Sequence, residues 1–380
     1  PTWDCDGQGN CSDPGTGNGA YATDSACQSN CIVITPTWDC DGQGNCSDPG
    51  TGQGTYASLS ACQSNCIVVP SMITIPVVIH IIHRNTHPNI GAGTNISNAQ
   101  IEDQLRVLNE DYSKTNPEFP NPPRNTFLSY AGNPEIQFCL ATIDPNGNST
   151  NGITRTSTTK LSFDTDTEAN DMKKNSTLGK DGWDPSRYFN IWICNLTTTG
   201  GGITLGYAYL PGLQSWNAWK DGLVVDYQYF GTTGNASSSS DGRIATHEIG
   251  HYLGLSHTFC ESGGCCDNDD SNVDDTPATD GIYFGTVNAN TNNNTCNDLL
   301  YPNIFTTDVL DMDENFMSFA STRWMFTNGQ VSAMLNTLNG YRSSLKNSTV
   351  TVNCSGIIPG SDTWDCDGQG NCSDPGNGSG

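Results

Sequence analysis

One short segment of the chain, residues 247–257, has the sequence HEIGHYLGLSH and brings three histidines close together. On a helix, residues four apart lie on one face, so His247 and His251 can both direct their imidazoles at one metal ion. Gly254 can adopt the left-handed conformation that ends a helix, which would return the chain and present His257 as a third ligand. Three nitrogen ligands with an open fourth position are typical of catalytic zinc, whereas structural zinc sites fill all four positions.

Glu248 stands next to the first of these histidines, where its carboxylate can reach a zinc-bound water without itself binding the metal. A bound zinc ion lowers the pKa of that water toward ~7 and polarises a carbonyl group. We therefore expect Glu248 to act as base and then as acid in the hydrolysis of a peptide bond. The alternative is a coincidence of polar residues on a surface helix, and the rarity of the whole pattern disfavours it.

A second group of histidines, His80, His83 and His87, falls in and after a β-branched run at residues 73–85. That run predicts a buried strand. Residues three apart on a strand point to opposite faces, so His80 and His83 are poorly placed to share a metal ion. We expect a structural or surface role for these three histidines rather than a second metal site.

The elements that position the zinc motif are expected within one domain of about residues 71–356. Beyond the run at 73–85, apolar segments bounded by glycine, proline or asparagine predict further strands. These segments are residues 136–142, 188–195, 204–210 and 223–230. With the helices described next, they predict an α+β fold in which a mixed sheet carries helices and is followed by irregular loops.

Three helices are expected in this domain. Ser97 and Gln100 form an S-x-x-Q capping box, and apolar residues follow at helical spacing as far as Tyr112. The residues at 239–241, Ser-Ser-Asp, could cap the helix that carries the zinc motif. Apolar residues at helical spacing over 331–345 predict a closing helix.

The ends of the chain carry a repeat with a period of 35 residues, which begins at Thr2 and again at Thr37. A third copy begins at Thr363 and stops at Gly380 before its second cysteine pair, so we expect it to be truncated. We therefore expect three cysteine-rich modules around the central domain, at residues 1–35, 36–70 and 361–380.

Each full repeat has four cysteines in the spacing C-x5-C-x15-C-x3-C. Units of about 35 residues bury too little apolar surface to fold unaided, so two disulfides per copy are expected, with zinc binding as the alternative. An acidic run at Asp4, Asp6 and Asp13 is expected to be solvated, because it lacks the full calcium-loop pattern. One tryptophan per copy is expected in a small core, or else on a surface that contacts glycans: Trp3, Trp38 and Trp364.

The composition of the chain restricts the partners and the cellular compartment that we expect for the protein. The 380 residues carry a net charge of −25, and a polyanionic surface of this kind disfavours nucleic acids and anionic membranes as partners. No apolar run approaches the ~20 residues of a membrane span. Seventeen cysteines at largely repeated spacings favour an oxidising compartment, so we expect a secreted protein whose signal peptide was removed or not included.

Together these motifs resemble those of the metzincin zinc peptidases, and within them the pappalysin family of ulilysin-like and cytophagalysin-like enzymes. HEIGHYLGLSHTF is followed by a Gly-Cys-Cys element at 264–266 and by VDDTP at 273–277. ENFM at 314–317 is similar to the family's Met-turn, and FTNGQ at 326–330 to the start of its last helix. The resemblance covers about residues 73–345 and does not extend to the repeats.

The resemblance implies a two-part catalytic domain with a cleft between the parts. His247, His251 and His257 would bind zinc, Met317 would lie beneath the metal, and the strand at 204–210 would border the cleft, where an extended substrate could pair with it. Family members also hold calcium near the DTP element, where carboxylate and carbonyl oxygens suit that ion, with a merely solvated acidic loop as the alternative. The matching residues are Asp270, Val273, Asp275 and Thr276.

The resemblance also implies disulfides. Cys139 would pair with Cys194, and Cys266 with Cys296. Two further cysteines, Cys260 and Cys265, could bridge each other, and Cys354 has no obvious partner.

One departure from the family's pattern concerns Phe319. In the family a tyrosine usually stands two residues after the methionine and hydrogen-bonds the reaction intermediate, whereas Phe319 has no hydroxyl. Loss of one such donor costs on the order of 10²-fold in rate unless another group replaces it. We nevertheless expect a secreted zinc metalloendopeptidase; the alternative is a surface adhesin or binding protein with an inactive metzincin domain.

A second departure generates a prediction about cleavage specificity. Family members that cleave beside Arg or Lys carry an acidic residue shortly after the Met-turn, but residues 318–323 contain none. We predict that bonds preceding basic residues are not preferred. Digestion of a peptide library, with products sequenced by mass spectrometry, tests this. A product set dominated by Arg or Lys directly after the cleaved bond would contradict it.

Overall fold

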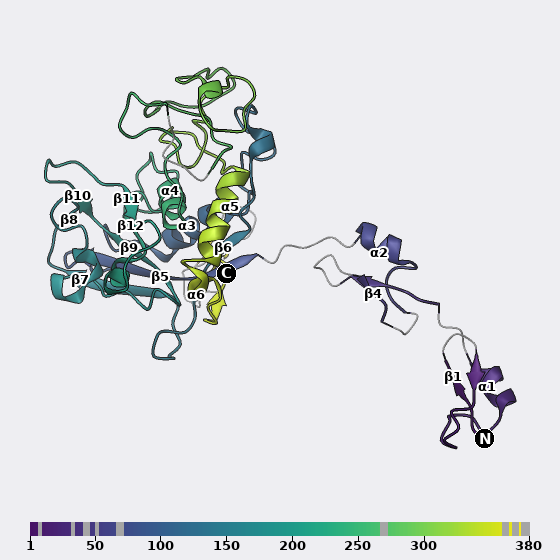
Figure 1. The fold of residues 1–380 in the computed structure, drawn as a ribbon. Helices are drawn as coiled ribbons and strands as arrows, with labels where there is room; N and C mark the ends of the chain where they lie inside the picture. The colour runs from purple at the N-terminus through teal and green to yellow at the C-terminus, as the bar shows by residue number, and fades with distance from the viewer. Residues whose placement is uncertain are drawn as a thin grey trace. The chain divides into compact units, whose positions relative to one another are not determined.

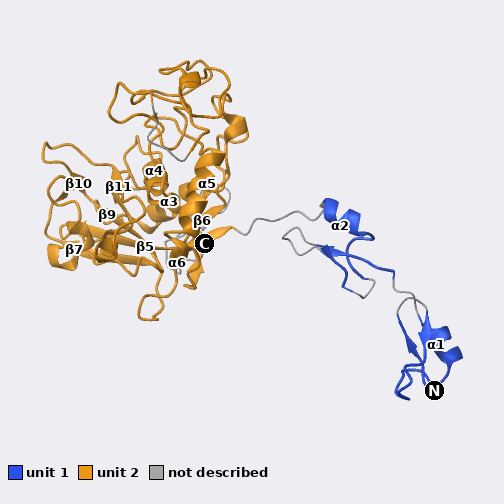
Figure 2. Ribbon diagram, in the orientation of Figure 1, with its two compact units in different colours: residues 1–71 blue, residues 72–380 orange. Residues whose placement is uncertain are grey.

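A computed structural model describes the chain at residues 1–6, 10–31, 35–40, 46–49, 53–65, 72–266, 273–358, 365–366 and 372–373. The chain divides into two compact units, residues 1–71 and residues 72–380, which we call the repeat unit and the large unit (Figure 2). The repeat unit contains the first two copies of the repeat, and the large unit contains the zinc motif.

Each copy in the repeat unit is a two-stranded hairpin followed by one short helix (Figure 1). In the first copy, Cys5 bonds Cys31 and Cys11 bonds Cys27, so the two disulfides expected there are confirmed. Thr23 caps the first helix, because its side chain accepts a hydrogen bond from the Ala26 N–H at 3.1 Å. The elements are β1 (Asp4–Cys5), β2 (Cys11–Ser12), α1 (Asp24–Asn30), β3 (Asp39–Cys40), β4 (Cys46–Ser47) and α2 (Leu59–Asn65).

The second copy follows the first. Cys46 bonds Cys62, which repeats the link between the second and third cysteines of the first copy. Trp3 exchanges backbone hydrogen bonds with Tyr21, and Trp38 does the same with Tyr56. These half-buried tryptophans thus help to close each small fold, as their interpretation as core residues predicts. In the third copy, β14 (Asp365–Cys366) pairs with β15 (Cys372–Ser373); Trp364 lies outside the described residues.

The large unit is built on a seven-stranded mixed sheet in the order β11-β12-β9-β5-β6-β13, with β7 also paired to β5. The five predicted strands are confirmed as β5, β6, β9, β11 and β12, although β11 and β12 are shorter than expected, whereas β7 and β13 were not predicted. The edge strands β11 and β13 are antiparallel to their neighbours, and the other pairings are parallel. The strands are β5 (Ile73–Arg84), β6 (Ile136–Ala141), β7 (Ile153–Thr158), β9 (Phe189–Cys194), β11 (Gly206–Ala208), β12 (Leu223–Asp226) and β13 (Val352–Asn353).

Strand β5 is buried on both faces, which explains its continuous β-branched sequence. Ile75, Val77, Ile79 and Ile81 face the main core beneath the helices. The alternate residues face a second layer of loops that contains the short parallel pair β8 (Phe163–Asp164) and β10 (Leu196–Thr197). In that layer His80 contacts Thr154 and Asn190, and burial lowers its pKa to about 4. This confirms a structural role for His80.

Helices α3 (Asn98–Asp111) and α4 (Arg243–Tyr252) pack on the main-core face of the sheet (Figure 1). Ser97 caps α3 by accepting from the Gln100 N–H, as predicted. The reciprocal half of the expected capping box is not formed. The Gln100 side chain instead donates to the carbonyl oxygens of Tyr227 and Phe230, which ties α3 to the segment leading to α4.

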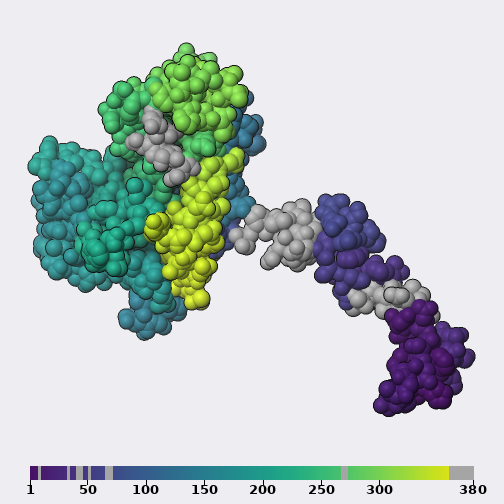
Figure 3. Space-filling model, viewed as in Figure 1, coloured from purple at the N-terminus to yellow at the C-terminus, as the bar shows by residue number. Residues whose placement is uncertain are grey.

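The chain between α4 and the last helices is irregular. Its Trp324 and Met325 form a second small core with Phe127, which comes from the segment between α3 and β6. The prediction of one closing helix over 331–345 is wrong in one respect. The chain forms two helices there, α5 (Asn328–Asn339) and α6 (Ser343–Lys346), which are separated at Gly340. Figure 3 shows this last part of the chain, in yellow, at the surface of the large unit. Short 3-10 turns complete the unit: η1 (Leu128–Tyr130), η2 (Asp171–Lys173), η3 (Asn175–Thr177), η4 (Ser215–Lys220) and η5 (Asp298–Leu300).

One implied disulfide is wrong. Cys139 bonds Cys354, and Cys194 is a buried free thiol. The register explains this. Cys139 lies opposite Pro76 of β5, whereas β9 lies on the other side of β5 and continues past Ile81, so the Cys139 and Cys194 sulfurs are too far apart to bond. Strand β13 instead runs antiparallel to β6 and brings Cys354 opposite Cys139.

Two further disulfides lie in the irregular part of the large unit. Cys266 bonds Cys296, and Cys260 bonds Cys265, which are the expected pairings. Within the described part of the chain, no helix has the length and apolar character needed to cross a bilayer.

A buried cation lies behind the edge strand β11. Lys173 of η2 donates to the Lys220 carbonyl oxygen at 2.5 Å. Its ammonium lies 4.9 to 5.4 Å from the ring centroids of Trp192, Tyr207 and Tyr209. Burial lowers the pKa of Lys173 to about 7.

This burial generates a prediction about stability and pH. Between pH ~7 and ~10 the unfolded chain binds a proton at residue 173 that the folded chain lacks, so the contribution of Lys173 to the free energy of unfolding rises with pH, by up to ~1.4 kcal/mol per unit. The difference between wild type and Lys173→Met in denaturant titrations should be constant at pH 5–6 and grow in favour of wild type above about 7. A constant difference throughout would mean an ordinary lysine pKa.

Candidate active site

Helix α4 carries the first two histidines and the glutamate of the motif. Its N-cap is Gly242, which has no side chain to cap the helix, but Asp241 accepts from the Arg243 N–H at 2.9 Å. The acidic residue before the helix therefore supplies the cap that the sequence predicted. Gly254, with φ +97°, turns the chain after the helix, and a side chain there would meet the Thr337 hydroxyl.

The three motif histidines converge on one point. Their Nε2 atoms lie 3.1 Å apart for His247 and His257, 3.2 Å for His247 and His251, and 3.1 Å for His251 and His257. Two nitrogens bound to one tetrahedral zinc ion, each at 2.0–2.1 Å, are separated by about 3.3 Å. The spacing of the donors therefore fits a zinc ion held by three imidazoles.

The other nitrogen of each ring faces an oxygen acceptor. His247 Nδ1 donates to the Phe316 carbonyl oxygen at 2.7 Å, His251 Nδ1 to the Leu255 carbonyl oxygen at 2.7 Å, and His257 Nδ1 to Glu261 at 2.5 Å. Each acceptor requires a proton on Nδ1, so a neutral ring must direct its Nε2 lone pair at the shared point. Three converging lone pairs repel one another unless a cation lies between them.

Charge and burial keep the rings of His247 and His251 neutral. Burial, together with the neighbouring histidines, holds the pKa of His247 well below its usual range and lowers that of His251 to about 4. Neutral imidazole is the form that binds a metal ion. Glu261 is a contact that sequence reasoning missed, although its spacing of four residues from His257 was visible.

Glu248 lies beside the edge strand β11. The Ala208 N–H donates to its carboxylate, and burial among protein atoms raises its pKa to about 8 while Arg323 opposes that rise. Gly206 makes room for this side chain, since a Cβ there would lie 3.3 Å from Glu248 Cγ and 3.0 Å from the Val224 carbonyl oxygen. The strand that the resemblance assigns to the cleft edge thus also holds the predicted base.

Met317 is fully buried beneath α4. Its sulfur occupies the space where a Cβ at Gly250 would lie, which explains the glycine inside the motif. The turn before it is fixed by polar contacts: the Met317 N–H donates to Asn315 Oδ1 at 2.9 Å, and the Asn315 amide exchanges two hydrogen bonds with Gln330 of α5.

Aromatic rings surround the histidines on one side. Phe259 stacks on His257 with ring centroids 4.8 Å apart and planes at 8°. Phe319 lies 4.9 Å from His257 and 5.5 Å from His247 by the same measure. The residue that replaces the family's tyrosine therefore packs against the histidines and offers no hydrogen-bond donor.

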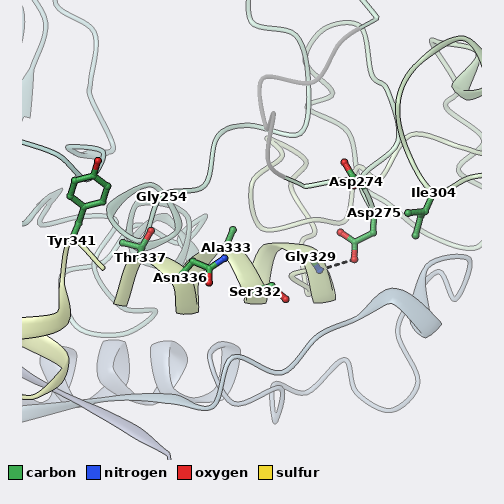
Figure 4. Close-up of a pocket in the computed structure, with 10 residues that line it drawn as sticks. All are labelled: Gly254, Asp274, Asp275, Ile304, Gly329, Ser332, Ala333, Asn336, Thr337 and Tyr341. Atoms are coloured by element: carbon green, nitrogen blue, oxygen red, sulfur yellow. Dashed lines mark hydrogen bonds between the residues drawn. The ribbon is translucent and has the colours of Figure 1, made fainter. Parts of the chain in front are cut away.

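The calcium residues implied by the resemblance are only partly described. Asp270 lies outside the described residues. The Asp275 carboxylate already accepts from the Thr327 hydroxyl at 2.6 Å and the Gly329 N–H at 2.8 Å, so it caps α5. Figure 4 shows the second contact at one end of a pocket of about 720 Å³ along α5. The Thr276 hydroxyl donates weakly to the Val273 carbonyl oxygen at 3.4 Å. The pocket includes none of the motif histidines.

Comparisons with known proteins point to one family of peptidases. The model of the peptidase family described as pregnancy-associated plasma protein-A matches residues 172–339. The structure of mature mirolysin from Tannerella forsythia in complex with a cleaved peptide is 38% identical, with a TM-score of 0.63, over 73% of this chain and 96% of that one. A mutant of promirolysin from the same organism is 37% identical, with a TM-score of 0.62, over 73% of this chain and 85% of that one.

Curated relatives are more distant. An extracellular metalloprotease of Pyricularia oryzae is 31% identical over 55% of this chain and 58% of its own length. An extracellular metalloprotease of Arthroderma benhamiae is 29% identical over 54% of this chain and 55% of its own length. The chain thus spans just over half the length of the curated relatives it matches.

The contact between Gly250 and Met317 predicts that the effect of Gly250→Ala on stability depends on the side chain at residue 317. Alanine in place of glycine inside a helix ordinarily stabilises by about 1 kcal/mol, but overpacking a core costs about 1–3 kcal/mol. Gly250→Ala should lower the free energy of unfolding in the wild-type background and raise it in a Met317→Ala background. Chemical denaturation followed by tryptophan fluorescence measures both. If Gly250→Ala stabilised the protein in both backgrounds, the Met317 sulfur would not be what excludes a larger side chain at residue 250.

Proposed function

Because this chain belongs to the pappalysin family of metzincin metallopeptidases, we propose that it is a zinc-dependent endopeptidase that hydrolyses peptide bonds at the site formed by His247, Glu248, His251 and His257. One observation carries the proposal: three Nε2 atoms lie within 3.2 Å of one another, with each Nδ1 facing an oxygen acceptor. The 38% sequence identity to mirolysin, over 96% of the mirolysin chain, also supports the proposal.

In this proposal His247, His251 and His257 hold the zinc ion. When bound, zinc polarises the carbonyl group of the substrate and lowers the pKa of the attacking water. The chain's own residues then move the proton. The Glu248 carboxylate accepts a proton from the attacking water and delivers it to the nitrogen of the leaving amine.

The substrate is proposed to lie along β11. This strand is at the edge of the sheet, and its Ala208 N–H already faces Glu248. An extended peptide paired with the edge would therefore pass beside the base. Phe319 would shield the histidines from water on the opposite side without supplying a hydrogen bond to the intermediate.

Two further proposals concern where the protein acts and whether it binds calcium. We propose that the protein acts outside the cell, because the relatives from Pyricularia oryzae and Arthroderma benhamiae are extracellular metalloproteases and the chain has six described disulfides. We also propose that calcium binds at the residues that the resemblance gives, Asp270, Val273, Asp275 and Thr276, where the Asp275 carboxylate also holds the start of α5. Contact of the repeats with glycans or a surface stays a prediction.

The proposed activity predicts a specific pattern of loss. Casein should be cleaved by the zinc-loaded protein, and a zinc chelator should abolish cleavage reversibly. Glu248→Ala should lower the rate at least ~10²-fold, because the general base is lost, while the zinc content is retained. Glu110→Ala, which removes a glutamate paired with Arg106 on the surface of α3, is the matched control and should leave the rate unchanged.

Cleavage that persists in Glu248→Ala would place the base elsewhere. No cleavage of casein or gelatin by the folded, zinc-loaded protein would favour the alternative, a binding protein with an inactive metzincin domain.

A further inference from the structure

Arg323 is a buried cation whose donors are poorly used. Its side chain is 9% exposed. Its Nη1 reaches the Ser318 carbonyl oxygen only at 3.4 Å, and its Nη2 lies 3.6 Å from Asp241. Among the described residues its Nε has no hydrogen-bond partner. A buried guanidinium normally satisfies its donors, because each unmade bond leaves the cost of desolvation uncompensated.

Two other buried arginines show the ordinary arrangement in the same unit. Arg124 pairs with Glu314 through two nitrogens and donates to the Asp311 carbonyl oxygen at 2.7 Å. Arg342 pairs with Asp221 through two nitrogens and donates from Nε to the Tyr252 carbonyl oxygen at 2.7 Å. Unlike Arg124 and Arg342, Arg323 has, within the part of the chain that the structure describes, no carboxylate that accepts hydrogen bonds from two of its nitrogens.

The guanidinium of Arg323 contacts two segments that flank the proposed active site, through the Ser318 carbonyl oxygen and the Asp241 carboxylate. Ser318 directly follows Met317, and Asp241 directly precedes the N-cap of α4. Phe319, the residue after Ser318, packs against His247 and His257. The Asp241 side chain is 36% exposed, so solvent reaches the ion pair from the side of Asp241.

We propose that Arg323 is a specificity-determining residue that binds a carboxylate of the substrate next to the scissile bond. A carboxylate would supply the bidentate partner that Arg124 and Arg342 have and Arg323 lacks. In a peptide this group is either an Asp or Glu side chain beside the scissile bond or the C-terminal carboxylate. The inference rests on the proposed peptidase function and adds a class of substrate to it.

Matched peptides test the proposal. Quenched fluorescent peptides would carry Glu or Gln on either side of the scissile bond, with the C-terminus amidated or free. Wild type should prefer Glu over Gln at one of these positions, or the free terminus over the amide, by about 10- to 100-fold in kcat/KM, since hydrogen bonds to charged groups contribute ~1.5–3 kcal/mol. Arg323→Gln should abolish that preference and still cleave the Gln peptide. Arg106→Gln, at a half-exposed arginine on α3, should keep the preference.

A binding measurement separates this proposal from the peptidase function itself. Anisotropy titrations on zinc-loaded Glu248→Ala should show tighter binding of the carboxylate-bearing peptide, and Glu248→Ala/Arg323→Gln should not. If Arg323→Gln does not fold, Asp241→Asn replaces it. Removing the competing carboxylate should increase the preference, whereas a merely structural pair would leave it unchanged. Equal handling of all peptides by wild type, in cleavage and in binding, would overturn the proposal even if casein is cleaved.

Discussion

The convergence of three imidazole lone pairs on one point is the constraint on which the rest of the large unit depends. Each ring is fixed from behind by an oxygen: the carbonyl oxygens of Phe316 and Leu255, and the Glu261 carboxylate. Such partners set both the tautomer and the direction of the ring. A helix alone would place two rings on one face, but it would not choose the nitrogen that each ring presents.

The surrounding structure holds those oxygens in place. Phe316 belongs to the turn that carries Met317, and this turn is tied to α5 through Asn315 and Gln330. The start of α5 is in turn held by Asp275, which comes from the irregular chain after α4. Segments distant in sequence thereby support one cluster of three histidines. On the other side, β11 holds Glu248 through a backbone N–H, so the sheet edge and the base are positioned together.

Much of this could be predicted from sequence where the signal is local. Helical spacing predicted that His247 and His251 share one face of a helix, and the structure brings both of them together with His257. The β-branched runs predicted the central strands. Predictions failed where the outcome depends on distant neighbours. Cys139 pairs with Cys354 because of strand order, which spacing does not report. Gln100 turns to carbonyl groups of another segment instead of completing its capping box. The poorly paired Arg323 is visible only once its neighbours are placed.

Zinc K-edge X-ray absorption on the purified protein tests the central claim most directly. The account predicts one zinc ion per chain, with three imidazole nitrogens and one oxygen at about 2.0–2.1 Å and no sulfur. Sulfur ligands at about 2.3 Å would place the zinc among the cysteines of the repeats. A shell made of oxygen alone would contradict the convergence of the three histidines on a metal ion.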